Sequence, residues 1–175
     1  MMRVIAGRFR SRRLQSVPGL AVRPTPDRLR ESLFSVLALR LSGTVFLDAY
    51  AGSGSVGIEA LSRGAKHVVF IERSSKALEV LRQNLSGLAI EKDEGTVIRG
   101  SAPMLLHNHP CDIAFIDPPY DKADEYEQSL NALSATQVEL VIAQHPSRMS
   151  LNENYGRLRK MRVLKQGDNS LSFYE

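Results

Sequence analysis

The segment from Cys111 to Tyr120 reads CDIAFIDPPY and places an acid directly after a run of apolar residues. Two prolines follow Asp117, and neither has a backbone N–H that could extend a sheet. The Asp117 carboxylate and the Pro118 carbonyl are therefore presented as two neighbouring acceptors. Two such acceptors match an exocyclic amino group of a nucleobase, which carries two hydrogens. Tyr120 adds a ring on which a flipped-out base can stack.

These candidate catalytic residues, Asp117, Pro118 and Tyr120, would serve an attack by the amino nitrogen. Accepting both N–H bonds draws the nitrogen toward tetrahedral geometry and points its lone pair at an electrophile such as a methyl sulfonium. The carboxylate stabilises the positive charge that develops on the nitrogen. No strong base is needed beforehand, because the proton can leave after the transfer. The alternative is a proline-stiffened loop in which the acid only caps the backbone.

A second segment, Gly52 to Gly57, matches G-x-G-x-x-G between an apolar run and a helical pattern. Glu72 follows Gly52 at the end of the next apolar run, twenty residues on. This order is typical of sites for nucleoside-containing cofactors, in which the acid binds the ribose hydroxyls. Glycines also occur in tight turns for conformational reasons alone. The prediction of a cofactor site therefore depends on the strand, turn, helix and acid in this order, and not on the glycine pattern by itself.

Asp48 indicates which cofactor this turn would bind. It lies four residues before Gly52, where the pyrophosphate of a dinucleotide would sit. A carboxylate repels phosphate there but attracts a moiety that carries an ammonium and a sulfonium. The sequence therefore predicts S-adenosylmethionine, and a dinucleotide is the less favoured alternative.

The beginning of the chain is strongly basic. Residues 1–22 contain five arginines and no acid: Arg3, Arg8, Arg10, Arg12 and Arg13. Guanidinium groups donate in a bidentate fork, so this composition predicts phosphate recognition, with a solvated basic tail as the alternative. The alternating pattern before Pro18-Gly19 favours a hairpin-like extension over a disordered one.

The elements that must position these residues alternate along the chain. Strands are predicted at 45–50, 67–72, 96–100, 112–117 and 138–144, and helices at 56–63, 75–87 and 124–135. A further helix is predicted to begin at Thr25-Pro26, with the Thr25 hydroxyl as its cap, and residues 157–175 read as a closing hairpin around Gly167-Asp168-Asn169. Apolar strands that alternate with amphipathic helices predict a parallel sheet covered on both faces.

Composition sets the broad class. The chain has 175 residues, of which 43% are hydrophobic and 24% charged, as in ordinary globular domains. No apolar run approaches the ~20 residues of a membrane span, and no secretory leader is visible. Cys111 is the only cysteine, which excludes an intrachain disulfide and suits a reducing compartment. We expect a cytoplasmic protein with neither a metal nor a membrane partner.

Asp48-Ala-Tyr-Ala-Gly-Ser-Gly, Glu72 and Asp117-Pro-Pro-Tyr, in this order, resemble class I methyltransferases that act on amino groups. VRPTPDRLRESLFSVL followed by DAYAGSGSVGIEALSRGA resembles, more specifically, the RsmD-like family of bacterial 16S rRNA guanine-N2 methyltransferases, over nearly the whole chain. The resemblance implies an α/β, Rossmann-like fold with a mostly parallel seven-stranded sheet flanked by helices. It implies one methyltransferase domain, 1–175, with a basic RNA-binding extension at 1–22 and a cofactor-binding catalytic core at 23–175.

The resemblance also implies the reaction, which is S-adenosylmethionine-dependent methylation of the N2 amino group of a guanine, guanine 966 of the small-subunit RNA. The partner would be 16S rRNA or the assembling small ribosomal subunit. The residues implied for the cofactor are Arg23, Thr25, Asp48, Gly52, Ser53, Gly54, Glu72, Ser101 and Ala102. Asp117, Pro118 and Tyr120 would bind the guanine.

Two positions depart from the family pattern. Gly100-Ser101-Ala102 stands where we expect an acid that binds the adenine amino group, and a serine hydroxyl accepts more weakly. Gln144 stands where a glutamate is usual, and His145 follows it. We predict that His145 lies at the surface or the rim of the site and has no catalytic role.

Two alternatives remain open. A DNA adenine-N6 methyltransferase shares the Asp117-Pro-Pro-Tyr motif, but such enzymes usually add a sizeable target-recognition region, for which residues 1–22 leave little room. A non-catalytic RNA-binding ribosome assembly factor would keep the cofactor pocket only as a scaffold. The intact motif argues against the second alternative, because a scaffold does not require those acceptors.

Overall fold

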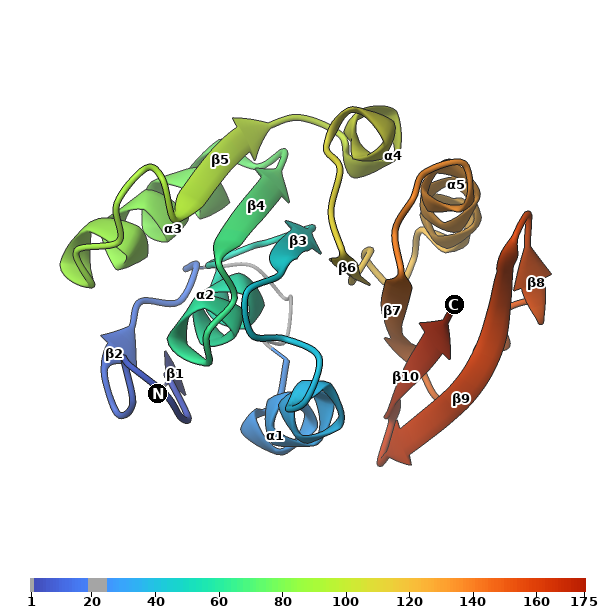
Figure 1. The fold of residues 1–175 in the computed structure, drawn as a ribbon, viewed down its shortest axis with the longest axis horizontal. Helices are drawn as coiled ribbons and strands as arrows, with labels where there is room; N and C mark the ends of the chain where they lie inside the picture. The colour runs from blue at the N-terminus through green and yellow to red at the C-terminus, as the bar shows by residue number, and fades with distance from the viewer. Residues whose placement is uncertain (1, 19–24) are drawn as a thin grey trace.

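The computed structural model describes residues 2–18 and 25–175, and its centre is a mostly parallel sheet with helices on both faces (Figure 1). The strands of this sheet are β3 (Val45–Ala49), β4 (His67–Glu72), β5 (Gly95–Arg99), β6 (Ile113–Ile116), β7 (Leu140–Pro146), β8 (Asn154–Tyr155), β9 (Leu158–Gln166) and β10 (Asn169–Tyr174). They lie in the order β5-β4-β3-β6-β7-β10-β9-β8. The strands β3 to β7 are parallel, and β10 runs antiparallel to both β7 and β9.

The strand order reverses at β3, which pairs with β4 on one side and with β6 on the other. Chain connections therefore leave this point in opposite directions, and in open α/β sheets ligands bind outside the carboxyl ends of the strands at such a point. The Rossmann-like α/β prediction is confirmed, including the closing hairpin, whose turn is Gly167-Asp168. The two-residue strand β8 adds an eighth member at the edge of the seven predicted.

Helices cover the two faces as two separate hydrophobic clusters. The helices are α1 (Asp27–Leu37), α2 (Ser55–Ser62), α3 (Ser75–Gly87), α4 (Ala102–Leu105) and α5 (Ala123–Ser134), with a 3₁₀ turn η1 (Leu106–Asn108). The first three pack on one face, and α4, η1 and α5 pack on the other. Successive residues of β3 point to opposite faces: Phe46 belongs to the first cluster and Leu47 to the second. This two-sided burial explains why the strands read as nearly continuous apolar runs.

The predicted start of the first helix is correct in place and wrong in its cap. Helix α1 begins at Asp27, with Pro26 before it and no side-chain cap. The Thr25 hydroxyl instead donates to Gln144 Oε1 at 3.0 Å, at the end of β7. This partner lies 119 residues further along the chain, so no local pattern could indicate it. The short α4 and η1 were not predicted.

The basic beginning of the chain forms a small two-stranded sheet of β1 (Met2–Arg3) and β2 (Arg13–Leu14), which confirms the hairpin-like extension. Its apolar side chains lie in the same hydrophobic cluster as α1, α2 and α3: Met2, Val4, Phe9 and Leu14. All are less than a tenth exposed. The extension is therefore packed on the body of the molecule.

Helix α2 holds this extension through two buried polar side chains. The Glu59 carboxylate accepts the backbone N–H groups of Ile5 at 2.8 Å and Ala6 at 3.0 Å. The Ser62 hydroxyl accepts the N–H of Phe9 at 2.9 Å. Because α2 starts at the glycine-rich turn, the extension and that turn are fixed to one helix.

Candidate active site

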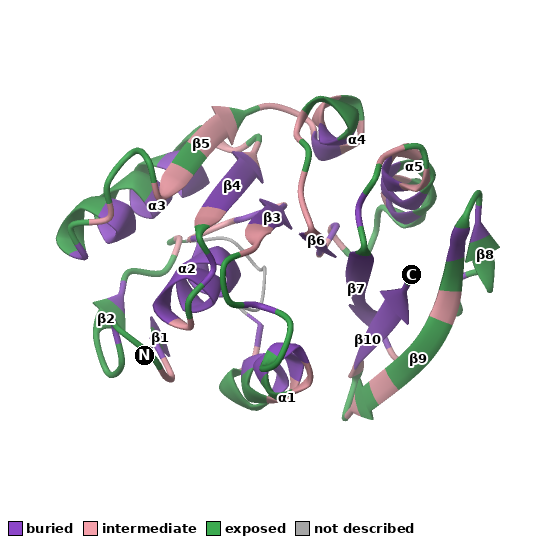
Figure 2. Ribbon diagram, viewed as in Figure 1, coloured by how far each residue is buried: buried purple, intermediate pink, exposed green. Residues whose placement is uncertain are grey.

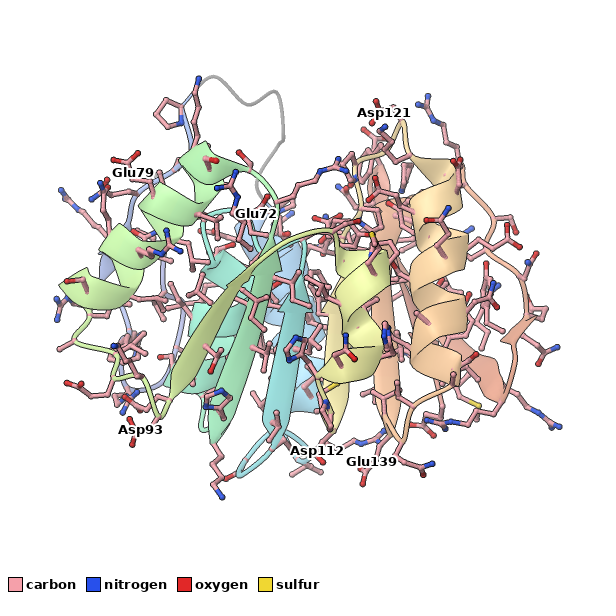
Figure 3. The ribbon with its side chains drawn as sticks, turned by 90° about the horizontal axis from the view of Figure 1, so that it is seen from above. Glu72, Glu79, Asp93, Asp112, Asp121 and Glu139 are labelled. Atoms are coloured by element: carbon pink, nitrogen blue, oxygen red, sulfur yellow. The ribbon has the colours of Figure 1, made fainter. Side chains whose placement is uncertain are left out.

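The carboxyl ends of β3, β4, β5 and β6 meet at one edge of the sheet, and the predicted site residues follow them. Asp48 is aligned with Phe70 of β4 and Phe115 of β6, near the ends of all three strands. In Figure 3 Glu72 lies at this edge, whereas Asp93 and Asp112 lie at the opposite one. The fold thus brings together Asp48, the glycine turn, Glu72 and Asp117, which the sequence had connected only by motif.

The three glycines of the turn have different roles. Gly54 has a φ of +82°, and a Cβ there would lie 2.3 Å from Leu81 Cδ1. A Cβ at Gly57 would lie 2.3 Å from Phe70 Cε1, so this glycine allows α2 to pack closely on β4. A Cβ at Gly52 would meet nothing within 4 Å. Gly52 therefore borders open space, where the backbone can be approached closely by a ligand.

Glu72 shapes the turn with both of its carboxylate oxygens. Its Oε2 accepts the Gly52 N–H at 2.8 Å, and its Oε1 accepts the Ser74 N–H at 2.7 Å. A carboxylate has about four lone-pair sites, so acceptor capacity remains for two ribose hydroxyls. The geometry is consistent with the predicted role and adds a structural one.

Asp48 is buried, and its Oδ2 accepts the Gly57 N–H at 2.8 Å. Burial raises the pKa of Asp48 to about 7 against the lowering effect of this hydrogen bond, and the negative charge of Glu72 raises it further. The bond joins the end of β3 to the first turn of α2. Asp48 therefore stabilises the glycine turn through this hydrogen bond and also places a titratable carboxyl beside it.

Asp117 follows β6 directly and lies close enough to Asp48 for their charges to interact. Burial raises the pKa of Asp117 to about 8, and the charge of Asp48 adds to the shift. Within residues 2–18 and 25–175, no hydrogen bond reaches the Asp117 carboxylate. A cation bound beside both carboxyls would favour their ionised forms. The pair therefore suits the ammonium and sulfonium of S-adenosylmethionine and opposes a pyrophosphate.

The Pro118 carbonyl already accepts one hydrogen bond, from the Tyr126 hydroxyl at 3.1 Å. No motif in the sequence indicates this donor, and Tyr126 lies on the buried face of α5. A carbonyl oxygen has two lone pairs, so a second donor can still be accepted. Tyr126 thus fixes the carbonyl while leaving it available.

Tyr120 is 44% exposed at the same edge. Its hydroxyl donates to Asn169 Oδ1 at 2.6 Å, which ties the loop after β6 to the start of β10. Asn169 was predicted only as a turn residue. Nothing in the sequence spacing relates positions 120 and 169, because the sheet alone makes them neighbours.

The remaining cofactor candidates lie around the same edge. Ser101 precedes α4 and Ala102 is buried at its start, and the neighbouring Gly100 N–H donates to the Glu72 carbonyl at 3.0 Å. The Ser53 carbonyl accepts from Asn84 Nδ2 of α3 at 2.9 Å, and Asn84 was not predicted as a site residue. The Thr25 bond to Gln144 places Thr25 at the end of β7, and Arg23 lies outside the described residues.

The prediction for His145 was wrong in its location. Its side chain is buried, with 3% exposed, and its Nε2 lies 2.8 Å from Ser172 Oγ. Burial lowers the pKa of His145. The antiparallel strand β10 pairs with β7 at this point, with Ser170 opposite His145, an arrangement that the sequence alone does not reveal. The side chain is a packed member of the sheet rather than a rim residue.

The five arginines of the extension are all exposed and fall into two groups. Arg8 pairs with Glu94 at 2.6 Å, and Arg12 donates to the Gly87 carbonyl at 2.8 Å. These two fasten the extension to the end of α3 and to the loop before β5. Within the described ranges, the guanidinium groups of Arg3, Arg10 and Arg13 have no ion-pair partner.

Two wider features of the described residues are relevant to the site. They contain no group of three or more His, Cys, Asp or Glu side chains arranged to bind a metal ion. None of their helices has the length and apolar character required to cross a bilayer.

Comparison with known proteins gives one family and a consistent set of relatives. The family model described as "Conserved hypothetical protein 95" matches residues 2–175. A Bacillus subtilis protein named "Putative rRNA methyltransferase YlbH" is 35% identical over 99% of this chain and 98% of its own length. The Haemophilus influenzae "Ribosomal RNA small subunit methyltransferase D" is 40% identical over 68% of this chain and 64% of its own length.

Solved structures agree with the sequence comparison. "Putative methyltransferase yhhF from Escherichia coli" superposes with a TM-score of 0.85 and 30% identity, and covers 99% of this chain and 96% of that one. A putative RNA methyltransferase from Pyrococcus horikoshii has a TM-score of 0.78 at 18% identity, over 93% of this chain and 92% of its own. The latter likeness concerns the fold, which is that of class I methyltransferases.

Proposed function

This chain belongs to the family described as conserved hypothetical protein 95, and from that premise we propose that it methylates the N2 amino group of a guanine in 16S ribosomal RNA. Like the relatives named above, it is an rRNA methyltransferase. The finer assignment, to N2 and to guanine 966 of the small-subunit RNA, is our proposal. The observation that carries it is the Asp117 carboxylate beside the Pro118 carbonyl, next to the glycine turn.

S-adenosylmethionine would be held by Gly52, Glu72 and Asp48, with Ser101 and Ala102 beside its base. When bound, it supplies a methyl group on a positively charged sulfur. Glu72 has acceptor capacity for the ribose hydroxyls, and the backbone at Gly52 leaves room for close approach. The resemblance also assigns Arg23 and Thr25 to the binding of the cofactor.

The guanine would stack on Tyr120 and donate its two amino hydrogens to Asp117 and to the free lone pair of Pro118 O. The Tyr126 hydroxyl holds that carbonyl in place. As the nitrogen gains positive charge, the ionised Asp117 stabilises it more strongly than it stabilises the neutral amine. Its raised pKa also makes Asp117 a competent acceptor of the proton that leaves afterwards.

Residues 1–22 would act as an RNA-binding extension of a core formed by 23–175. Arg3, Arg10 and Arg13 offer exposed guanidinium groups for phosphates, while Arg8 and Arg12 fasten the extension to the core. The substrate is RNA in the cytoplasm, either free or within the assembling subunit.

The test uses 16S rRNA from a strain in which the corresponding gene is deleted. Purified protein and methyl-labelled S-adenosylmethionine are incubated with that RNA, free or in small subunits, and methylated nucleotides are mapped by mass. We expect one N2-methylguanosine, at position 966. Transfer to adenine in DNA would support the DNA methyltransferase alternative. Tight RNA binding with no transfer to any substrate would support the assembly-factor alternative.

A further inference from the structure

A basic groove lies between strand β9 and the segment 147–153, on the face of the sheet that also carries α5. Its volume is about 540 Å³. Its lining residues include Arg148, Lys160, Arg162 and Lys165, together with one acid, Glu153. Neither the glycine turn nor the Asp117 loop contributes to this lining.

Most of the positive charges of the groove have no acidic partner among the described residues. Glu153 pairs with Lys160 at 2.8 Å. In the part of the chain that the structure describes, Arg148, Arg162 and Lys165 form no ion pair. Strand β9 as a whole carries four basic residues and no acid in the sequence LRKMRVLKQ. Figure 2 shows β9 largely exposed beside the buried strands β7 and β10.

The floor of the groove is polar and ordered. Ser170 and Ser172 of β10 line it beside His145, whose Nε2 bonds Ser172 Oγ at 2.8 Å. Ser170 Oγ lies 2.9 Å from Ser147 Oγ. The two hydroxyl groups of β10 are buried and already paired, so they fix the floor, and the exposed cationic side chains of Arg148 and Lys165 are the groups that can reach phosphates.

The groove begins beside the catalytic loop. Residues 147–153 follow β7, whose carboxyl end lies at the same edge as that of its parallel neighbour β6. The Ser147 N–H donates to the Asp168 carbonyl at 2.9 Å, and Tyr120 bonds the adjacent Asn169 at 2.6 Å. An RNA strand whose target base is stacked on Tyr120 would therefore pass next to the groove.

We propose that this groove binds the phosphates of the RNA strand that flanks the target guanine, opposite the N-terminal extension. This inference rests on the proposed function, since it assigns a second contact surface to the same substrate. Figure 1 places β1 and β2 at one end of the sheet and β9 at the other, with β6 between them. The RNA is then held on both sides of the base that reacts.

Positive charge on an exposed edge strand has another known use, which is to prevent edge-to-edge aggregation. The groove differs from such an edge because Arg148 lies on a separate segment and because polar side chains floor it. The experiment separates the two roles by measuring association state as well as RNA binding.

The test compares Arg148→Ala/Lys165→Ala with a matched double variant, Lys66→Ala/Lys92→Ala. Both control residues are exposed, and they lie outside the groove and the site. We expect the groove variant to bind 16S rRNA roughly tenfold more weakly, with a salt slope reduced by about two. The KM for RNA should rise, while turnover at saturating RNA and affinity for S-adenosylmethionine stay at wild-type values. The control should match wild type throughout.

Several outcomes would overturn the proposal. One is an unchanged RNA affinity and salt slope in a folded groove variant. Another is weaker binding to the small subunit but not to naked rRNA, which would assign the groove to a ribosomal protein. A third is oligomerisation without loss of RNA affinity, which would make β9 a protected edge only. If the wild-type protein binds 16S rRNA but does not methylate it, the proposed function fails, and the binding comparison still decides the role of the groove.

Discussion

The Asp117 carboxylate is proposed to accept an amino hydrogen and to stabilise the charge that develops on the nitrogen. Removing this carboxylate should therefore slow the methyl transfer itself. Asp117→Ala deletes one preorganised acceptor, which typically lowers turnover by about 10²–10³, or roughly 2.7–4 kcal/mol. Asp117→Asn should lose somewhat less, because its amide oxygen still accepts but carries no charge. Single-turnover methylation with saturating cofactor and RNA measures this step directly.

Asp121 gives the matched control for that prediction. It is an exposed acid on the same loop, and Figure 3 shows it at the same edge of the molecule as Glu72. Asp121→Ala should react within about threefold of wild type. If Asp117→Ala also stays within that range while remaining folded, the two prolines stiffen a loop and the carboxylate has no part in the reaction.

Asp48 should make the cofactor-free protein less stable as the pH rises. Burial raises its pKa to about 7 in the folded state, from 3.8 for an unperturbed aspartate. Between these values the folded state keeps a proton that the unfolded state has lost, so the free energy of unfolding falls as the pH increases. The favourable contribution of protonated Asp48 to the free energy of unfolding is fully present below about pH 4. It is lost as the pH rises through about 7.

Asp48→Asn removes the cost of burying an ionised carboxylate, and its amide oxygen can still accept the Gly57 N–H. We expect the variant to be more stable than wild type at pH 8 by on the order of 2–4 kcal/mol, with little gain at pH 4.5. Urea denaturation at both pH values measures the difference. The same variant should bind S-adenosylmethionine more weakly. A stability difference that does not change with pH would contradict the assignment of the raised pKa to Asp48.

Glu59 shows how a helix can control a distant segment. Its Oε2 accepts from Ile5, and its Oε1 accepts from Ala6 and from Arg63 Nε at 2.7 Å. Glu59→Gln replaces one oxygen with a donor, so at least one buried N–H is left without an acceptor at a cost of about 1–3 kcal/mol. The extension should then open more often, and trypsin should cleave at its arginines about tenfold faster. Glu79→Gln, an exposed substitution on α3, is the control and should digest at the wild-type rate.

At the scale of elements, local patterns in the sequence were sufficient for most of the fold. The five parallel strands and the helices 55–62, 75–87 and 123–134 were predicted to within a few residues, because apolar runs and helical periodicity record burial directly. The helical turns at 102–108 were missed, since a proline and a short length obscure the periodicity. The carboxyl-edge location of Asp48, Glu72 and Asp117 followed from the parallel sheet.

What the sequence could not provide were contacts made across the sheet. The bond from Tyr126 to the Pro118 carbonyl, the pairing of Thr25 with Gln144 and the burial of His145 all depend on which strands become neighbours. These contacts determine which acceptors remain available to a substrate. They also explain why the motif alone could not indicate the hydrogen-bond partners of the candidate site residues.

At the scale of the whole molecule, charge is arranged around the carboxyl edge of the sheet, where the candidate site residues lie. The extension at one end of the sheet and β9 at the other are both basic, while the centre carries Asp48, Glu72 and Asp117. Under the proposed function, the basic ends would attract the polyanionic RNA, and the acidic centre would exclude its phosphates and accept a cationic cofactor and an amino group. This arrangement would direct a base, rather than the backbone, toward the reacting position.

The two groups of arginines in the extension give the last prediction. Arg10→Ala/Arg13→Ala removes two exposed guanidinium groups that have no ion-pair partner among the described residues. The salt slope of 16S rRNA binding should fall by about two, because under the proposed role each guanidinium would neutralise one phosphate. Arg12→Ala should change the slope little, because its guanidinium donates to the Gly87 carbonyl. Its expected effect is faster proteolysis of the extension.

Titrations of labelled rRNA at several salt concentrations, with S-adenosylmethionine affinity measured on the same preparations, distinguish these results. The cofactor affinity should be nearly unchanged in both variants, since Arg10, Arg12 and Arg13 are exposed and are not among the residues proposed to hold the cofactor. If the double variant keeps the wild-type salt slope, the extension is a solvated surface and the RNA is held elsewhere. If Arg12→Ala lowers the slope as much per charge as Arg10→Ala/Arg13→Ala does, the Arg12 guanidinium exchanges the Gly87 carbonyl for a phosphate when RNA binds.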